Sequence, residues 1–260
     1  MNTNDFKTRT EIIEEQSTCP EGYWVLGLDT GYSSVKGKSP NKRFAFPYYA
    51  KKVPEGRAFL REAEDSDIRY RDETGEWVVG KLAYDEVNAK EIVDSEQELT
   101  GRHRFFTDIF RVTTRTGIAL GLMPNKYGSC EDKHIMIEAG LPPKYINDAV
   151  DLREALCGKH DFEVKVGAGN WIKYSIELKE NDIQVMPQPL GSLVSASTNA
   201  NGRQLKTAIQ YWSGNVIVFD PGYGTLDTYI VKRGQVIGKG ETFPEYGMHE
   251  VFARTCRDIE

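Results

Sequence analysis

The sequence has few cysteines and no cysteine pair. Its four cysteines lie far apart in 260 residues, and no C-x-x-C motif joins any two of them: Cys19, Cys130, Cys157 and Cys256. This spacing excludes a disulfide-stabilised scaffold and favours a reducing compartment. Cys157 and His160 are close in sequence, but a zinc site needs a second pair of ligands, which this sequence does not offer. We therefore expect no structural metal at these residues.

Excess positive charge and long apolar runs are also missing. Lys and Arg number 33 against 39 Asp and Glu, which gives a net charge of −6. Proteins that bind nucleic acid directly concentrate basic residues, so this balance argues against such binding. No apolar run approaches the ~18 residues of a membrane-spanning helix, and the polar N-terminus lacks the apolar core of a signal peptide. We expect a soluble cytoplasmic protein that contacts neither membrane nor nucleic acid.

Two common phosphate-binding motifs are absent. The chain has no G-x-x-x-x-G-K-[ST] loop and no G-x-G-x-x-G after an apolar strand. A nucleotide site in this chain must therefore be built from other elements. What is present is an ordinary globular composition, with 39% apolar and 28% charged residues. The length favours one to two domains.

Local patterns predict an α/β fold with mixed sheets, because hairpins alternate irregularly with helices. Apolar runs bounded by turn residues predict strands, and apolar residues at steps of three and four predict helices. Residues 1–21 are charged and without periodicity, and we expect a mobile tail there. The basic cluster Arg102–Arg104 is expected to be a solvated helix start. Strands are predicted over 24–28, 134–137 and 215–219, hairpins over 68–80, 161–178 and 228–237, and helices over 105–122 and 142–156.

Two distant segments share one pattern. Asp29–Lys36 and Asp220–Asp227 each follow an apolar strand, open with Asp, carry Gly two positions later and continue with small hydroxyl residues. Glycine permits a tight turn whose backbone N–H groups can approach an anion. An Asp at a strand end can hold Mg²⁺ through coordinated waters, and Lys36 can offer a point charge to a phosphate oxygen. Two such turns facing each other would hold a triphosphate between two domains.

Simpler interpretations remain open for the same residues. Asp29 and Asp220 can cap turns at strand ends, as Asx-turn residues do. Gln188, between two prolines, can be a loop residue that bonds to the backbone, and Lys36 can be a solvated strand lysine. The argument for a phosphate site is the agreement between the two distant segments, since each turn alone is common.

Four segments, Leu26–Lys36, Ala139–Pro142, Val185–Gly191 and Val218–Asp227, together resemble the actin-like ATPase superfamily. Within it, the resemblance is to the ParM/StbA group of plasmid-segregation proteins. The first and last segments resemble the two phosphate loops, including the Asp-to-Lys spacing of the first. The second resembles a Gly-Leu-Pro that follows a strand in ParM-like proteins. The third resembles the segment whose Glu or Gln orients the attacking water. The resemblance extends over about residues 23–250.

The resemblance implies an RNase H-like, two-domain actin fold of the α/β class. Residues 22–212 would form domain I, with an inserted subdomain at about 51–100, and residues 213–260 would begin domain II. The second domain of an actin-like protein needs more strands and helices than this last stretch can supply. We therefore expect domain II to be incomplete in this sequence and the 260 residues to be part of a longer chain.

The resemblance also implies residue roles. Asp29 and Asp220 would hold Mg²⁺ through water, and Gln188 would orient the attacking water, which makes these three the catalytic set. Gln has no basic pKa to offer, so its role would be positioning. Lys36 would counter phosphate charge, and Asp227 would support the second loop. The other residues expected to cradle ATP or GTP are Thr30, Gly31, Tyr32, Gly222, Tyr223, Gly224 and Thr225.

By the same resemblance, the chain is expected to be a filament-forming ATPase. Such proteins bind Mg²⁺ and ATP between two domains, assemble head to tail and hydrolyse the nucleotide. They separate plasmids through a DNA-binding adaptor of the ParR type, so they need not touch DNA themselves. Two alternatives remain open: a small-molecule kinase of the same superfamily, and a non-hydrolysing actin-like scaffold. Pro221 favours the scaffold, because it replaces a small residue of the family pattern and removes an N–H group.

Overall fold

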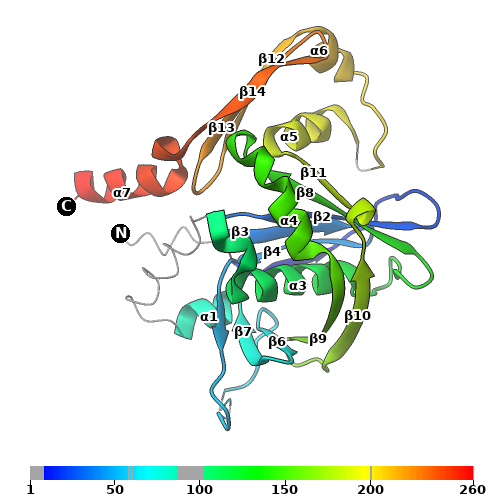
Figure 1. The fold of residues 1–260 in the computed structure, drawn as a ribbon, viewed down its shortest axis with the longest axis vertical. Helices are drawn as coiled ribbons and strands as arrows, with labels where there is room; N and C mark the ends of the chain where they lie inside the picture. The colour runs from blue at the N-terminus through cyan, green and yellow to red at the C-terminus, as the bar shows by residue number, and fades with distance from the viewer. Residues whose placement is uncertain (1–8, 58, 60, 87–101, 200, 260) are drawn as a thin grey trace.

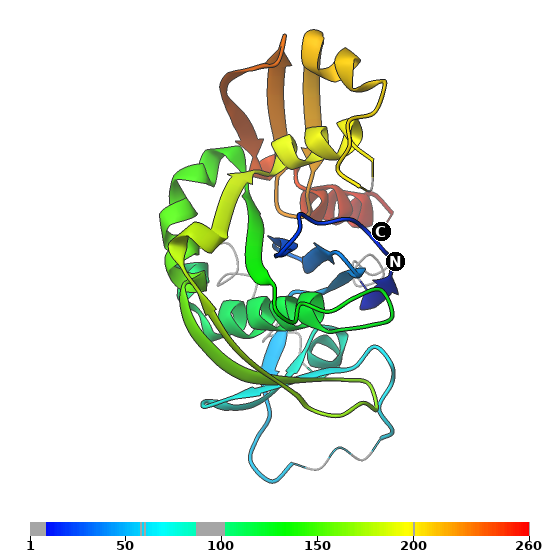
Figure 2. The same cartoon turned by 90° about the vertical axis from the view of Figure 1, so that its right-hand side faces the viewer.

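The computed structural model describes residues 9–57, 59, 61–86, 102–199 and 201–259. Its first sheet has six strands in the order β1-β4-β3-β2-β8-β11 (Figures 1 and 2). β8 runs parallel to both β2 and β11, and the remaining neighbours are antiparallel, so the sheet is mixed as predicted. The strands are β1 Glu11–Glu14, β2 Tyr23–Thr30, β3 Ser34–Ser39, β4 Lys42–Pro47, β8 His134–Leu141 and β11 Ile183–Pro187.

The prediction of a mobile tail over residues 1–21 is wrong for residues 11–14, which form strand β1. Glu11–Glu14 pairs with strand β4 in antiparallel register, and Ile12 lies opposite Phe44. The strand has only two apolar residues, Ile12 and Ile13, and a glutamate on either side of them. This short sequence has no alternation of apolar and polar residues from which a strand could be predicted. Residues 1–8 of the predicted tail lie outside the described residues.

A second sheet of five antiparallel strands has the order β10-β9-β6-β7-β5. It contains two of the three predicted hairpins, those over 68–80 and 161–178, and β6 pairs with β9 to join them. The range predicted for the inserted subdomain, about 51–100, is therefore too narrow, because two of the five strands of its sheet come from residues 158–178. Residues 58, 60 and 87–100 of that range lie outside the described part. The strands are β5 Ala50–Lys52, β6 Ile68–Asp72, β7 Gly75–Val79, β9 Gly158–Val166 and β10 Ile172–Leu178.

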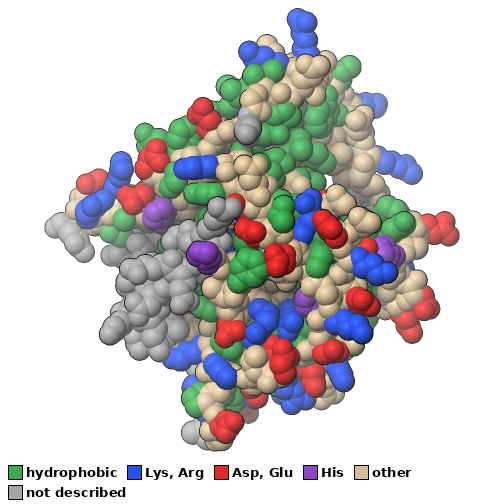
Figure 3. Space-filling view, in the orientation of Figure 1, with side chains coloured by type: hydrophobic (Ala, Val, Ile, Leu, Met, Phe, Trp, Pro, Cys, Tyr) green, Lys and Arg blue, Asp and Glu red, His purple; other side chains and the backbone are tan. Residues whose placement is uncertain are grey.

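A third sheet, β12-β13-β14, stands at one end of the molecule (Figures 1 and 2). Hydrophobic side chains gather on the surface over it (Figure 3). Its inner face packs on α5, where Leu193 contacts Tyr229 and Val231. The domain boundary predicted at residue 212 therefore separates residues that pack together. The elements of this unit are α5 Gln188–Ser197, α6 Ala208–Ser213, β12 Asn215–Pro221, β13 Leu226–Lys232 and β14 Gln235–Phe243.

The central helix α3, Asp108–Leu122, lies between the six-stranded and five-stranded sheets (Figure 1). Thr107 caps its N-terminus by accepting a hydrogen bond from the Phe110 N–H at 3.2 Å. At Gly121 a Cβ atom would lie 2.5 Å from Leu26 Cδ1, so glycine permits the close approach to β2. The first predicted helix is thus confirmed from its capping residue onward, and its apolar stripe forms the main core with both sheets.

The remaining helices are short, except α7 at the C-terminal end of the described residues. The second predicted helix begins as a 3₁₀ segment, η3, and becomes α-helical only in α4. None of the helices within the described ranges is both long and apolar enough to cross a membrane. Their bounds are α1 Lys81–Glu86, η2 Arg102–Phe106, η3 Pro143–Asp148, α4 Ala149–Leu156, η4 Glu180–Asp182, η5 Pro244–Tyr246 and α7 Met248–Ile259.

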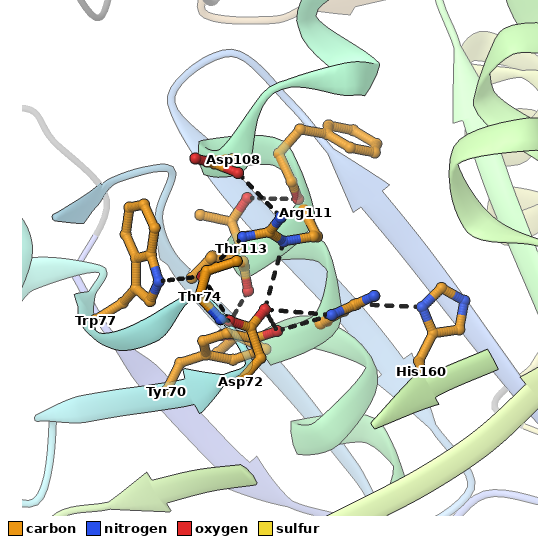
Figure 4. A network of polar contacts seen from close by, with 12 residues as sticks. Tyr70, Asp72, Thr74, Trp77, Asp108, Arg111, Thr113 and His160 are labelled. Atoms are coloured by element: carbon orange, nitrogen blue, oxygen red, sulfur yellow. Dashed lines mark hydrogen bonds and ion pairs between the residues drawn. The ribbon is translucent and has the colours of Figure 1, made fainter. Parts of the chain in front are cut away.

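A buried polar network fastens α3 to the five-stranded sheet (Figure 4). The fully buried Asp72 side chain accepts hydrogen bonds from Tyr70 Oη at 2.8 Å and Thr74 Oγ1 at 2.6 Å. It also forms ion pairs with Arg111 Nε at 3.4 Å and Arg115 Nη1 at 3.3 Å. Burial would raise the pKa of Asp72, but the hydrogen bonds and the Arg111 charge hold it below its ordinary value. The carboxylate therefore stays charged in the core.

His160 extends this network from β9 (Figure 4). Arg115 Nε donates to His160 Nδ1 at 3.1 Å, so the ring proton lies on Nε2, which is 2.8 Å from the Leu156 carbonyl oxygen. Burial lowers the pKa of His160, and the nearby Arg115 charge acts in the same direction. The imidazole is thus held neutral. These contacts account for the buried position of His160.

Candidate nucleotide site

The two predicted phosphate turns are β-hairpins of the same register. In the first, the pairing of β2 with β3 places Asp29 opposite Lys36. In the second, the pairing of β12 with β13 places Asp220 opposite Asp227. In both hairpins one further residue pair follows, Thr30 with Val35 and Pro221 with Leu226. Four residues then connect the two paired strands. Two segments from distant parts of the chain therefore have the same local geometry.

Each of these loops begins with glycine for the same steric reason. A Cβ atom at Gly31 would lie 3.1 Å from the Ser34 carbonyl oxygen, and one at Gly222 would lie 3.1 Å from the Thr225 carbonyl oxygen. In the second loop the Gly222 N–H donates to that Thr225 oxygen at 2.8 Å. The tight turns expected from the sequence are present in both hairpins.

Both loops line one cleft with a volume of about 1060 Å³. This volume is slightly above the usual range for small-molecule and cofactor sites, so the cleft is large enough for a ligand the size of a nucleotide. The cleft brings together every residue that the sequence predicts for the site. They are Asp29, Thr30, Gly31, Tyr32, Lys36, Gln188, Asp220, Gly222, Tyr223, Gly224, Thr225 and Asp227.

Gln188 reaches the first hairpin from the start of α5. Its Nε2 donates to Asp29 Oδ1 at 2.9 Å. The parallel strands β2, β8 and β11 end at the same edge of the sheet, which is where ligands bind in sheets of this kind. Gly140 at the end of β8 leaves the necessary room, since a Cβ atom there would lie 2.7 Å from Gln188 Cγ. The simpler interpretation, in which Gln188 only bonds to the backbone, does not describe this contact.

Asp29 has an unusual electrostatic environment. Burial raises its pKa, and the negative charge of Asp220 adds to this effect. The positive charges of Lys36 and Arg104 and the hydrogen bond from Gln188 act in the opposite direction. A carboxylate whose charge is disfavoured by its surroundings gains from a bound cation, because the cation offsets both the burial and the like charge.

Asp227 is a second buried carboxylate of the cleft. It is 2% exposed, and its Oδ2 accepts a hydrogen bond from Thr225 Oγ1 at 3.0 Å. Its Oδ1 has no hydrogen-bond partner among the described residues. Burial raises the pKa of Asp227. The bond to Thr225 ties the last residue of the second loop to the strand that follows, which agrees with a supporting role for Asp227.

The first turn of α7 fixes the backbone of the second loop. The Met248 N–H donates to the Gly222 carbonyl oxygen at 3.0 Å, and the His249 N–H donates to that of Tyr223 at 3.0 Å. Pro221, the departure from the family pattern, ends β12 with its strand pairing intact. The turn that follows keeps its hydrogen bonds, so the missing N–H of Pro221 does not disturb the loop.

Arg104 is a residue of the cleft that the sequence did not reveal. The prediction of a solvated helix start is wrong for it, because it is 7% exposed and lines the cleft. Its Nη2 donates to the Thr30 carbonyl oxygen, and its guanidinium carbon lies 4.8 Å from the centre of the Tyr32 ring. These partners lie more than 70 positions earlier in the chain. No local pattern could have indicated contacts of that separation.

The side chains present fit a magnesium ion held through water. In the part of the chain that the structure describes, no three His, Cys, Asp or Glu side chains gather to hold a metal directly. Asp29 and Asp220, however, face the same cleft from opposite hairpins. Mg²⁺ prefers oxygen ligands and usually keeps several of its waters. Two carboxylates with unfavourable mutual charge are a suitable donor set for such a hydrated ion.

The sequence of this chain is similar to one known domain family. The family model described as the N-terminal domain of actin-like proteins matches residues 27–191. This stretch contains the first hairpin, α3, the five-stranded sheet and Gln188. No curated protein matches the chain.

Several solved structures share the fold. The apo ParM protein of pSK41 matches with a TM-score of 0.63 and 16% identity, over 92% of this chain and 71% of that one. A ParM filament from Clostridium botulinum matches with a TM-score of 0.56 and 19% identity, over 91% and 70%. AlfA from the B. subtilis plasmid pLS32, also a filament, matches with 0.56 and 15%, over 91% and 80%. At these identities the likeness shows the fold, and the predicted actin-like fold is confirmed.

Proposed function

This chain belongs to the actin-like proteins, and from that premise we propose that it is an ATPase that assembles into filaments. It would bind a magnesium nucleoside triphosphate, ATP or GTP, between its two hairpin loops. One observation carries the proposal. Two hairpins of equal register, far apart in the chain, present glycine turns to one cleft in which Gln188 is bonded to Asp29.

The side chains of the cleft suit phosphoryl transfer to water, which depends on positioning and on stabilisation of charge. Gln188 donates its amide N–H to Asp29, so its amide oxygen is the atom that would accept a hydrogen bond from the attacking water. Lys36, opposite Asp29, would offset charge on the phosphate oxygens. Asp29 and Asp220 would hold Mg²⁺ through water, and the bound ion supplies further positive charge to the phosphate.

Self-assembly is supported by the likeness to ParM and AlfA filaments. A head-to-tail contact that does not close into a ring produces a helical filament. We infer that the cargo is a plasmid, attached through a DNA-binding adaptor of the ParR type. The net charge of −6 supports this arrangement, because the adaptor rather than the filament would contact the DNA.

The enzyme activity is tested by release of inorganic phosphate from Mg²⁺–ATP and Mg²⁺–GTP. Asp220→Ala should abolish phosphate release, because the substitution removes a carboxylate that would hold the hydrated cation. Assembly into filaments does not require this carboxylate and is expected to persist in the variant. Asp161→Ala is a matched control, since Asp161 is exposed on β9 away from the cleft. Unchanged turnover in Asp220→Ala would contradict the role of Asp220.

Assembly is tested separately by light scattering and negative-stain electron microscopy. The unsubstituted protein should form filaments with Mg²⁺ and a nucleoside triphosphate at micromolar concentrations. If no nucleotide induces filaments, the filament proposal is wrong, even where phosphate release is observed.

A further inference from the structure

Arg104 is a buried cation with an incomplete set of hydrogen bonds. Its Nη2 donates to the Thr30 carbonyl oxygen, and it lies 3.5 Å from Thr30 Oγ1. Its Nη1 is buried and has no hydrogen-bond partner among the described residues. Burying an unpartnered donor on a charged group is costly. An arginine whose only task is to stabilise the fold would be expected to have more of its five donors paired.

The guanidinium of Arg104 lies over the ring of Tyr32 in the first loop. The distance from its central carbon to the ring centre is 4.8 Å, within the range of a cation–π contact. A second ring, that of Phe105, lies 5.3 Å from the same carbon. Arg104 therefore contacts the first loop twice, once through its backbone at Thr30 and once through the Tyr32 side chain.

The Tyr32 ring also contacts the second loop. A Cβ atom at Gly224 would lie 2.5 Å from Tyr32 Cδ2, so the ring packs directly on the Gly224 backbone. Gly224 in turn leaves no space for a Cβ atom at Gly247, just before α7. Tyr32 is thus a place where the two loops touch, and Arg104 packs against the residue that makes this contact.

The charge of Arg104 acts within the cleft as well. It opposes the burial that raises the pKa of Asp29 and that of Tyr32. Apart from Lys36, it is the cation that most affects the Asp29 carboxyl group. An arginine in this place can favour an anionic ligand through its charge and also fix the loop that contacts the ligand.

We propose that Arg104 is a positioning residue of the nucleotide site. Its guanidinium holds Tyr32 against Gly224 and so sets the spacing of the two loops at which both contact one triphosphate. The inference rests on the proposed nucleotide function, but it concerns a residue that no motif of the site includes. It requires Arg104 to act through Tyr32, and this coupling is what an experiment can measure.

The test uses Arg104→Met and Arg104→Lys in the full chain. The dissociation constant for Mg²⁺–ADP is measured by calorimetry, KM and kcat by phosphate release, and thermal unfolding without nucleotide. Arg104→Met should raise the dissociation constant and KM about tenfold, equivalent to about 1.4 kcal/mol. Its apo unfolding temperature should not fall, because the change also removes the unpartnered donor. Arg104→Lys keeps the charge but not the planar group, and should lose part of the affinity. His103→Gln, an exposed neighbour, is the control.

A double-mutant cycle separates positioning from general packing. In a Tyr32→Leu background, Arg104→Met should cause little further loss of affinity, since its route of action is already gone. Fully additive losses, or wild-type affinity in both Arg104 variants, would overturn the proposal while leaving the nucleotide site standing. Failure of the unsubstituted protein to bind Mg²⁺–ADP and Mg²⁺–ATP would overturn the proposed function and this inference together.

Discussion

Single atoms decide the geometry of the cleft. At Gly140 the absence of a Cβ atom leaves room for Gln188 Cγ, and the Gln188 amide then reaches the Asp29 carboxylate at 2.9 Å. At Gly224 the same absence admits the ring of Tyr32. Neither Gly140 nor Gly224 has a positive φ, so neither glycine is required by a left-handed backbone conformation. Their task is close approach between elements, which the sequence alone does not distinguish from a turn.

Gly140→Ala should lower phosphate release without abolishing nucleotide binding. The new Cβ atom would displace Gln188 from Asp29, and misplacing a positioning group costs about 10- to 100-fold in rate. Phosphate-release kinetics and Mg²⁺–ADP affinity measure the two effects. Gly191→Ala is a matched control, because a Cβ atom there meets Met186 Sδ at an ordinary 3.8 Å. A normal rate in Gly140→Ala would contradict the role assigned to Gln188.

Among the elements, helix α3 connects the six-stranded and five-stranded sheets. It packs on two sheets at once, and its outer surface meets the five-stranded sheet through the charged network around Asp72. Removing one partner from a buried ion pair leaves an uncompensated charge, so such networks tolerate substitution poorly. The neutral His160 completes the arrangement by accepting a hydrogen bond from Arg115.

His160 should make the stability of this junction depend on pH. Its pKa is lowered in the folded protein, so as pH falls the unfolded chain takes up the proton first, near its ordinary pKa of 6.5. The stability due to neutral His160 is therefore complete above that pH and is lost as pH falls through the lowered folded pKa. Urea unfolding at pH 7 and pH 5 should show a smaller loss for His160→Gln than for the unsubstituted protein. Equal losses would contradict the prediction.

At the scale of the whole molecule, the cleft is where the first and third sheets meet. Besides the loops, the Lys144 N–H of η3 donates to Thr242 Oγ1 of β14 at 3.2 Å. A Cβ atom at Gly240 would lie 2.8 Å from Pro143 Cβ, so β14 packs closely on η3. A ligand that contacts both loops adds a further link between the two sheets, and it stabilises only the folded chain.

Nucleotide with Mg²⁺ should therefore raise the free energy of unfolding, by about 2.7 kcal/mol at a concentration 100 times the dissociation constant. Differential scanning calorimetry with and without the ligand measures this. Chelation of Mg²⁺ should reduce the shift, because Asp29 and Asp220 would then face the phosphates without a cation between them. Adenosine and guanosine, which lack phosphates, serve as controls. An equal shift with either nucleoside would show that the phosphates do not contribute to binding, which contradicts this prediction.

Features that depend on residues close in sequence could be predicted, whereas features that depend on contacts between distant residues could not. The two Asp-Gly turns, the hairpins and α3 follow from short patterns, and the turns also located the cleft. Strand β1 escaped prediction because its stability comes from pairing with β4 rather than from its own residues. Arg104 escaped because its partners are distant in sequence. The extent of the five-stranded sheet depends on β6 meeting β9, which no local pattern encodes.

The two hairpins match in register but not in charge. Lys36 stands opposite Asp29, whereas the equivalent place opposite Asp220 holds Asp227. Two identical hairpins would accept a linear ligand in either direction, because turning it end for end would exchange equal surroundings. The difference between Lys36 and Asp227 removes that equivalence. We therefore expect an asymmetric ligand to bind in one preferred direction, with its most negative end toward Lys36.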